Sequence, residues 1–345
     1  MLKFYRHKNV SIIISEKEMV KIEKFKYLHV KRDTEYIETE IPIKKNGIYY
    51  LTGKENYWLI SSGKAKDLQS QFVNKGIVGL GWSDIDLKEI KELSENDMRK
   101  LISKKYSKLQ NNYKDEKSFK AYVTSIYNKF IRFVNEIKLG DIIVLKDRGS
   151  DKVYFGKVVS EAEDYSSKDL FIDDDTGHCN KIRRVQWLKS INKNGVGSDL
   201  RLAFTARHAI SKIKREKVHE EINREIFTYF YRGNQLHIVF KVEKKDDISH
   251  DDFKMFQDYI HNIKQQCLEK SSIENNFNIK ANVQSPGPIE FFGNPDIVQY
   301  IYKIITIASA TKFGVTTYKN ISKRLKIKNP SKEVEKIEDG FTKGN

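Results

Sequence analysis

The chain has 345 residues, which is too long for one typical domain and enough for two with a small extension. With 39% hydrophobic and 12% aromatic residues it has the material for packed cores, which argues against wholesale disorder. Lys and Arg number 63 against 47 acidic residues, and the net charge of +16 favours a polyanionic partner such as nucleic acid. A lysine-rich proteome would produce the same excess, so charge alone does not decide.

The sequence offers no membrane-spanning segment. A helix that crosses a bilayer needs roughly 20 apolar residues, and the best candidate, 297–310, is interrupted by Gln299 and Lys303. No signal peptide opens the chain, and Cys179 and Cys267 are too few for a disulfide framework. We therefore expect a cytoplasmic protein with no membrane partner.

Residues 1–53 are predicted to form a β-rich extension. Apolar and polar residues alternate over 10–14 and 36–43, as they do in strands with one buried face. Asn46-Gly47 is a turn signal ahead of another apolar run at 48–51. The role of this extension is not apparent from its sequence.

Residues 54–212 are predicted to form a short β-barrel with helices packed on it. Apolar residues recur at helical spacing in the longest predicted helix, for example at Ile126, Phe130 and Phe133. The strands read as short apolar runs bounded by glycine or charged turns. The predicted helices are 65–74, 87–93, 95–106 and 117–136, and the predicted strands are 57–60, 77–82, 141–146, 152–159 and 183–188.

Residues 216–327 are predicted to form a small α/β domain, entered through a basic stretch at 207–215. Strand and helix signals alternate in a βαβα order, and a stiff loop rich in proline and glycine precedes the last helix. The predicted elements are a strand at 236–242, a helix at 250–267, a strand at 277–283, a loop at 284–290 and a helix at 296–310. Residues 328–345 are expected to be a flexible tail. The whole chain is therefore predicted to be α+β.

A series of short motifs follows a fixed order in the second unit. Tyr57-Trp58 stands on a strand that ends in Ser61-Ser62-Gly63, and Gly79-Leu-Gly-Trp82-Ser83 follows. Then come Leu139-Gly-Asp-Ile-Ile-Val144, Tyr154-Phe-Gly-Lys-Val158, His178 and Arg183-Arg-Val-Gln-Trp187. Over residues 56–190 this order resembles the EVE domain, a PUA-like fold related to the YTH readers of methylated adenine. It is most similar to the version found at the front of modification-dependent restriction proteins.

The resemblance implies a pocket that captures one flipped base. Taking a base out of its stack costs a few kcal/mol, and stacking on an aromatic side chain offsets roughly 1–3 kcal/mol of that. By the resemblance, Trp82 would stack on the base, Ser61, Ser62 and Ser83 would contact its edge, and Asp84 would accept a hydrogen bond from an exocyclic amine. Trp58 and Trp187 lie within apolar strands, so we expect them in the core.

The second wall of this pocket and its phosphate contacts are less defined by the sequence. Tyr154 is the candidate for the second wall, with Tyr113 and Tyr165 as alternatives. Basic residues near the hairpin loop and the closing strand could contact phosphates, although each could equally be an ordinary surface arginine. They are Arg148, Arg183 and Arg184.

Other chemistry has weaker support. The acidic run 173–175, followed by His178 and Cys179, lacks the spacing of a calcium loop or a zinc site, so no metal or other cofactor is expected. Glu243-Lys-Lys245 resembles half of a metal-dependent nuclease core. Its only upstream acidic partner would be Glu225, which lies in a predicted helical segment.

The sequence thus predicts a sensor that is not itself an enzyme and that reads nucleic acid, with modified DNA favoured over RNA, in a restriction or antiviral defence setting. The third unit would couple this reading to a nuclease or NTPase partner protein or to self-association. The alternatives are a metal-dependent, modification-directed nuclease with a catalytic C-terminal domain, and a reader of RNA modifications.

Overall fold

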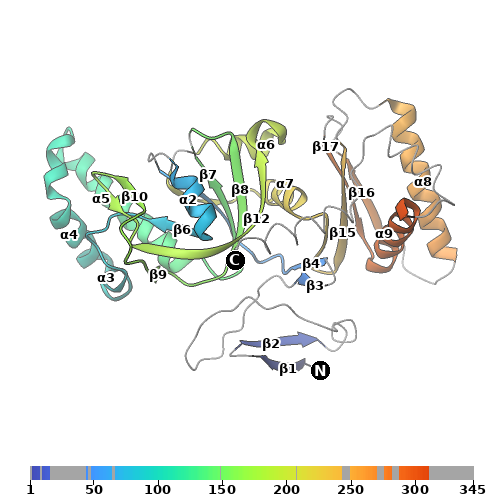
Figure 1. Cartoon of the computed structure of the whole chain (residues 1–345), viewed down its shortest axis with the longest axis horizontal. Coiled ribbons are helices and arrows are strands. Elements are labelled where there is room, and N and C mark those ends of the chain that lie inside the picture. The colour runs from blue at the N-terminus through green and yellow to red at the C-terminus, as the bar shows by residue number, and fades with distance from the viewer. Residues whose placement is uncertain are drawn as a thin grey trace.

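The computed structural model describes residues 2–7, 10–15, 44–45, 48–63, 67–147, 149–206, 208–242, 249–269, 276–281 and 287–310. Within them the chain forms two large sheets with helices packed on both, and two small hairpins (Figure 1). The predicted α+β class is confirmed. The predicted strand at 36–43, the Asn46-Gly47 turn and the tail 328–345 lie outside the described residues.

The first large sheet curls into a half-barrel. Its order is β13 (Ile210–Ile213), β5 (Tyr57–Ser61), β7 (Ile142–Lys146), β8 (Lys152–Val158), β12 (Lys181–Asn192) and β6 (Ile77–Leu80), with the short β9 (Glu163–Asp164) also on β12. β5 and β7 are parallel, and the other pairs are antiparallel. The long β12 bends the sheet because its first half pairs with β6 and its second half with β8.

The central strands of this sheet are buried on both faces, which explains their unbroken apolar sequences. Along β5, Trp58 and Ile60 enter one hydrophobic cluster, while Tyr57 and Leu59 enter another on the opposite face. Such alternation follows from the two-residue period of a strand. The predicted core positions of Trp58 and Trp187 are confirmed, since both are buried.

Helices pack on the first cluster and match the predictions closely. Those that follow β6 in the chain gather at one end of the molecule beside β9 (Figure 1). The elements are α2 (Leu68–Lys75), α3 (Leu87–Glu92), α4 (Glu95–Lys105), η1 (Ser107–Asn112), α5 (Glu116–Ile131) and the π-helical turn η2 (Arg132–Glu136). A small hairpin of β10 (Phe171–Asp173) and β11 (Gly177–His178) lies between β9 and β12 in the chain.

The second large sheet has the order β16 (Phe277–Ala281), β17 (Gly287–Gly293), β15 (Gln235–Val242), β14 (Tyr229–Arg232), β4 (Ile48–Leu51) and β3 (Lys44–Lys45). Helices α8 (His250–Glu269) and α9 (Pro295–Ala310) lie together on its outer side (Figure 1). The predicted alternation of strands and helices is confirmed. The predicted loop at 284–290 is wrong from residue 287 onwards, because β17 pairs with β15 and β16 on its two sides.

The two sheets share a core, which the predicted boundaries at 53 and at 212–216 did not anticipate. Helices α6 (Ser198–Ala203) and α7 (Glu216–Ile226) contribute to one cluster with β5, β7, β8 and β14. Strand β4, assigned to the extension by its sequence, pairs in parallel with β14.

The short η3 (Lys193–Gly195) precedes α6, and β1 (Leu2–His7) pairs with β2 (Val10–Ser15). No helix in the described ranges has the length and apolar character to cross a membrane.

Candidate functional site

A cavity of about 550 Å³ opens where three strands of the first sheet end. Ser61 and Ser62 close β5, Trp82 follows β6, and Asp147 follows β7; all line the cavity. Because β5 and β7 are parallel, with Ser61 opposite Lys146, their carboxyl ends meet at the same edge. The structure therefore brings together three residues that the sequence predicted to form one pocket.

Trp82 has an unusual backbone conformation. Its φ is 60°, in the left-handed region, which is uncommon for any residue other than glycine and is an outlier for a bulky one. The turn is held by the Trp82 amide, which donates to the Thr176 carbonyl at 2.7 Å. Strained backbone of this kind costs about 1–3 kcal/mol and clusters at functional sites.

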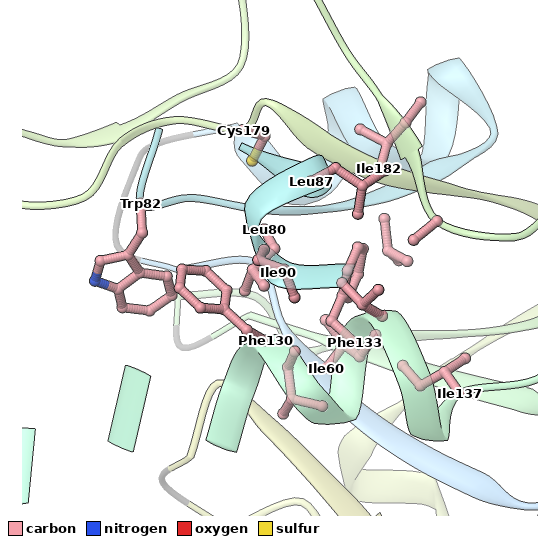
Figure 2. Packing of buried hydrophobic residues seen from close by; sticks show 14 of the residues in the cluster. Ile60, Leu80, Trp82, Leu87, Ile90, Phe130, Phe133, Ile137, Cys179 and Ile182 are labelled. Atoms are coloured by element: carbon pink, nitrogen blue, oxygen red, sulfur yellow. The ribbon is translucent and has the colours of Figure 1, made fainter. Parts of the chain in front are cut away.

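The indole of Trp82 is 7% exposed and lies at the edge of the main hydrophobic cluster. It meets Phe130 edge to face, with ring centroids 6.2 Å apart (Figure 2). Its Nε1 makes no hydrogen bond among the described residues, although it lies near Tyr122. The pKa of Tyr122 is raised by burial, and the nearby indole N–H opposes this effect.

Lys129, on α5, is a cavity residue that the sequence interpretation missed. Its Nζ lies 4.5 Å from the centroid of the Trp82 ring and donates to the Ser125 hydroxyl at 3.1 Å. Burial lowers the pKa of Lys129 to about 8, with a further contribution from the charge of Arg132. The helical spacing offered a signal, because position 129 is three residues after Ile126 and so borders the apolar face of the helix.

The serines occupy different settings on the cavity wall. Ser61 is half-buried, and its amide donates to the Ala209 carbonyl at 2.9 Å. Ser62 is 2% exposed, and its hydroxyl donates to Asp147 Oδ1 at 3.1 Å. Ser61 is therefore the better placed of the two to exchange hydrogen bonds with a ligand, while Ser62 orients Asp147.

Two further lysines give the cavity a positive rim. Lys146 donates to the carbonyls of Phe204, at 2.7 Å, and Ala206. Lys193 donates to the carbonyl of Asp147 at 2.6 Å. With Lys129, they place three amines against the two carboxylates of Asp147 and Asp173 on the lining. An aromatic ring, hydroxyl groups and a cationic rim are suited to a planar polar group attached to a phosphate chain.

Other predicted pocket residues do not line this cavity. The Ser83 side chain faces Gly177, where an added Cβ would lie 2.3 Å from the Ser83 hydroxyl oxygen. Asp84 is exposed beyond the strand end. Tyr154, in the middle of β8, contacts Trp187 edge to face at 6.2 Å. The alternatives Tyr113 and Tyr165 pack against the main cluster, so no predicted tyrosine forms a second wall of the cavity.

The predicted phosphate contacts divide into three cases. Arg183 is fully buried, and its guanidinium donates to the carbonyls of Phe133, Val134 and Ser160 at 2.7, 2.8 and 3.0 Å. A phosphate could not reach it, and the expected role is corrected to holding η2 against β12. Arg184 is exposed and pairs with Glu163 at 2.9 Å. Arg148 lies outside the described residues.

The Gly-Asp motif before β7 has a structural role. Asp141 is buried and accepts hydrogen bonds from the Trp58 indole at 2.8 Å and from the amides of Asn56 and Lys138, both at 2.9 Å. This carboxylate ties β5 to the start of β7.

Among the described residues considered for metal or nuclease chemistry, Asp173 alone lines the cavity. In the described ranges, no group of three or more His, Cys, Asp or Glu is arranged to hold a metal ion. Glu225 lies in α7, as its sequence indicated, and Glu243-Lys-Lys245 lies outside the described residues.

Comparison with known proteins gives limited information. Residues 58–206 match a family described as a domain of unknown function (DUF8426), a segment that includes Ser61, Trp82 and Lys129. Among solved structures, the chain is similar to protein Atu2648 from Agrobacterium tumefaciens. The sequence identity is 15%, the alignment covers 48% of this chain and 89% of that one, and the TM-score is 0.21. No curated protein matches the chain. None of these comparisons names an activity, a substrate or a partner.

Proposed function

We propose that the unit built on the first sheet (residues 54–212) is an EVE-type, PUA-like reader that captures one flipped base, chemically modified and in DNA, in the cavity beside Trp82. The observation that carries the proposal is the convergence of Ser61, Ser62 and Trp82 from two different strand ends on one cavity of about 550 Å³. That volume is within the range of small-molecule sites, which is about 300–1,000 Å³. The strained backbone of Trp82 and the net charge of +16 support the same reading.

Base capture in this cavity requires Lys129 to move. Its ammonium lies over the ring of Trp82, and a base stacked on that face would occupy the same space. The long stem of lysine can rotate, and the displaced amine would remain close to the phosphate of a flipped nucleotide. Lys129 would then exchange a cation–π contact for a phosphate contact.

Fluorescence anisotropy on matched modified and unmodified DNA duplexes tests the proposal. Wild-type protein is expected to bind at least one modified duplex more tightly, and Trp82→Ala is expected to remove that preference while salt-dependent binding persists. Loss of one stacking contact removes roughly 1–3 kcal/mol of binding free energy. This corresponds to a decrease of about fivefold to hundredfold in affinity for the modified duplex. Equal affinity of the wild type for every modified and unmodified duplex would refute base reading.

Two further variants separate the pocket from general folding effects. Ser61→Phe would fill the cavity from its half-buried edge and should abolish the preference without removing the indole. Ser83→Ala is the matched control, because the Ser83 side chain faces Gly177 instead of the cavity. Circular dichroism of each variant checks that the fold persists.

The wider setting of the proposal follows from the family resemblance. In a restriction or antiviral role, the second sheet with α8 and α9 would couple base reading to a nuclease or NTPase partner or to self-association. Matched RNA oligonucleotides in the same assay distinguish an RNA-modification reader. Mg²⁺-dependent cleavage of modified DNA, lost in Glu243→Ala, would instead establish the nuclease alternative.

A further inference from the structure

A second polar cavity, of about 330 Å³, lies at the seam between α7 and the second sheet and is separate from the Trp82 cavity. Its walls come from α7, the β14–β15 hairpin, β17 and the loop after β4, so distant parts of the chain meet there. None of these elements contributes to the proposed base-reading site. The residues at its inner wall include Asn223, His237 and Glu290.

A histidine–carboxylate pair forms part of the inner wall. His237 is 7% exposed and Glu290 is 5% exposed, and His237 Nδ1 lies 2.7 Å from Glu290 Oε1. Arg224 also reaches Glu290, at 3.5 Å. The imidazole ring stacks between Phe230 and Phe292, at centroid distances of 4.7 and 5.2 Å. The two stacking phenylalanines and the hydrogen bond at Nδ1 therefore hold the imidazole ring in one orientation.

The other nitrogen of His237, Nε2, makes no hydrogen bond to any described residue. A carboxylate only accepts hydrogen bonds, so Nδ1–H donates to Glu290, and in that neutral tautomer Nε2 is a hydrogen-bond acceptor. This Nε2 is buried and has no partner among the described residues. Buried polar atoms are nearly always paired, so an unpaired nitrogen on a cavity wall points to a partner outside the chain.

Asn223 provides a complementary unpaired group. It is 2% exposed, its Oδ1 accepts a hydrogen bond from the Tyr57 hydroxyl at 2.7 Å, and its Nδ2 has no partner in the described ranges. Two residues of the cavity lining, Asn223 and His237, thus each keep one buried polar atom without a partner in the described ranges. A molecule with a neighbouring acceptor and donor on one edge would satisfy both.

The charges around this cavity disfavour an anion. Its lining carries the carboxylates of Glu216, Glu220 and Glu290 against a single guanidinium, that of Arg232. Arg232 is itself paired with Glu216 at 3.1 Å and with Glu220 at 3.6 Å. A ligand with a phosphate or carboxylate would face net negative charge.

We propose that this seam cavity binds a small uncharged molecule with an amide-like or amidine-like edge, of the nucleobase or nucleoside class. Asn223 Nδ2 would donate to its carbonyl or ring nitrogen, and His237 Nε2 would accept from its N–H. Its volume is at the lower end of small-molecule sites, which suits a nucleoside better than a larger cofactor. Because the walls come from α7 and from the second sheet, occupancy would stabilise the packing of α7 on that sheet.

Isothermal titration of the full-length protein with adenosine, guanosine, cytidine and uridine, and with their 5′-monophosphates, tests this proposal. At least one nucleoside is expected to bind at one site per chain, and its monophosphate at least about tenfold more weakly. His237→Phe keeps the aromatic stack but removes Nε2, and should weaken nucleoside binding by about tenfold or more. Gln235→Trp should do the same by blocking the rim without touching the buried groups.

Trp82→Ala is the control that separates the two cavities, since it should leave nucleoside binding at the seam unchanged. The proposal is overturned if no nucleoside binds, or if folded His237→Phe and Gln235→Trp proteins bind as well as the wild type. Binding that is lost in Trp82→Ala but kept in His237→Phe would place the nucleoside in the first cavity and also overturn it. Equal binding of monophosphates would refute the charge argument.

Discussion

Lys129 and Trp82 form a cation–π pair in which the lysine Nζ lies 4.5 Å from the centre of the indole ring. The contact connects α5 to the turn after β6 and covers the aromatic face that a stacked base would use. Such contacts contribute about 0.5–2 kcal/mol, depending on how far the cation is removed from water. The pair is therefore strong enough to compete with base stacking and weak enough for a base to displace it.

Lys129→Ala should alter nucleic-acid binding in a salt-dependent way. The variant lacks both the competing ammonium and one positive charge near the phosphates. At about 50 mM salt the lost charge should weaken binding, whereas at about 500 mM salt, where charge effects are screened, base-specific binding should equal or exceed that of the wild type. Anisotropy titrations at both salt concentrations measure this crossover, and equal loss of base-specific affinity at both would contradict the competition.

The unfolding free energy should rise with pH between about 8 and 10. Burial lowers the pKa values of Lys129, Lys157 and Lys181 to about 8 in the folded protein, while an unfolded lysine titrates near 10.4. Between these pH values the unfolded chain binds more protons than the folded chain does. Raising the pH removes those protons and therefore favours the folded state. Urea unfolding across the interval measures the slope. Lys129→Met should reduce it, and an unchanged slope would show that Lys129 is not desolvated.

Neighbouring arginines should differ sharply in their effect on stability. Arg183→Met leaves three carbonyl groups, two of them buried and one partly buried, without their donor, and we expect a loss of about 3–5 kcal/mol in unfolding free energy. Arg184→Met removes only an exposed ion pair with Glu163. It should change the unfolding free energy by less than about 1 kcal/mol. Chemical denaturation of the two variants provides the comparison. A mild effect of Arg183→Met would argue against its buried role.

Gly177→Ala should destabilise the β10–β11 hairpin through two separate effects. Gly177 has a φ of +67°, and a Cβ there would lie 2.3 Å from the Ser83 hydroxyl oxygen. The backbone cost alone is about 1–2 kcal/mol. Adding Ser83→Ala should recover the steric part but not the backbone part, so the double variant should be more stable than Gly177→Ala. Thermal unfolding of the set tests this, and a purely additive result would mean that Ser83 points elsewhere.

Much of the secondary structure in residues 54–212 was predictable, because apolar runs and helical spacing are local features of the sequence. Apolar runs and helical spacing identified β5, β6, β7, β8, β12 and the helices α2 to α5, but not the short β9, β10 and β11. The two strand-buried tryptophans, Trp58 and Trp187, were recognised as core. The order of motifs also predicted that Ser61, Ser62 and Trp82 would share a pocket, and all three line one cavity. Periodicity along a chain reports which element forms and which of its faces is apolar.

Pairing between distant segments was decided only by the tertiary structure. The sequence indicated a stiff loop at 284–290, yet most of it is β17, because strands on both sides offer hydrogen bonds to it. Likewise, β4 joins the second sheet beside β14, about 180 residues further along the chain. Such partners leave no local pattern, since strand pairing depends on which edges the rest of the fold leaves open.

The sequence by itself determined the α+β class, the main strands and helices within residues 57–188 and the strand-end position of Trp82. Only the tertiary structure decided that Arg183 is buried, that Lys129 covers Trp82, and that His237, Glu290 and Asn223 line one seam. The physical reason is that charged and polar residues have no fixed environment of their own. Whether an arginine faces water or three carbonyl groups depends on the backbone brought against it, which a one-dimensional pattern does not record.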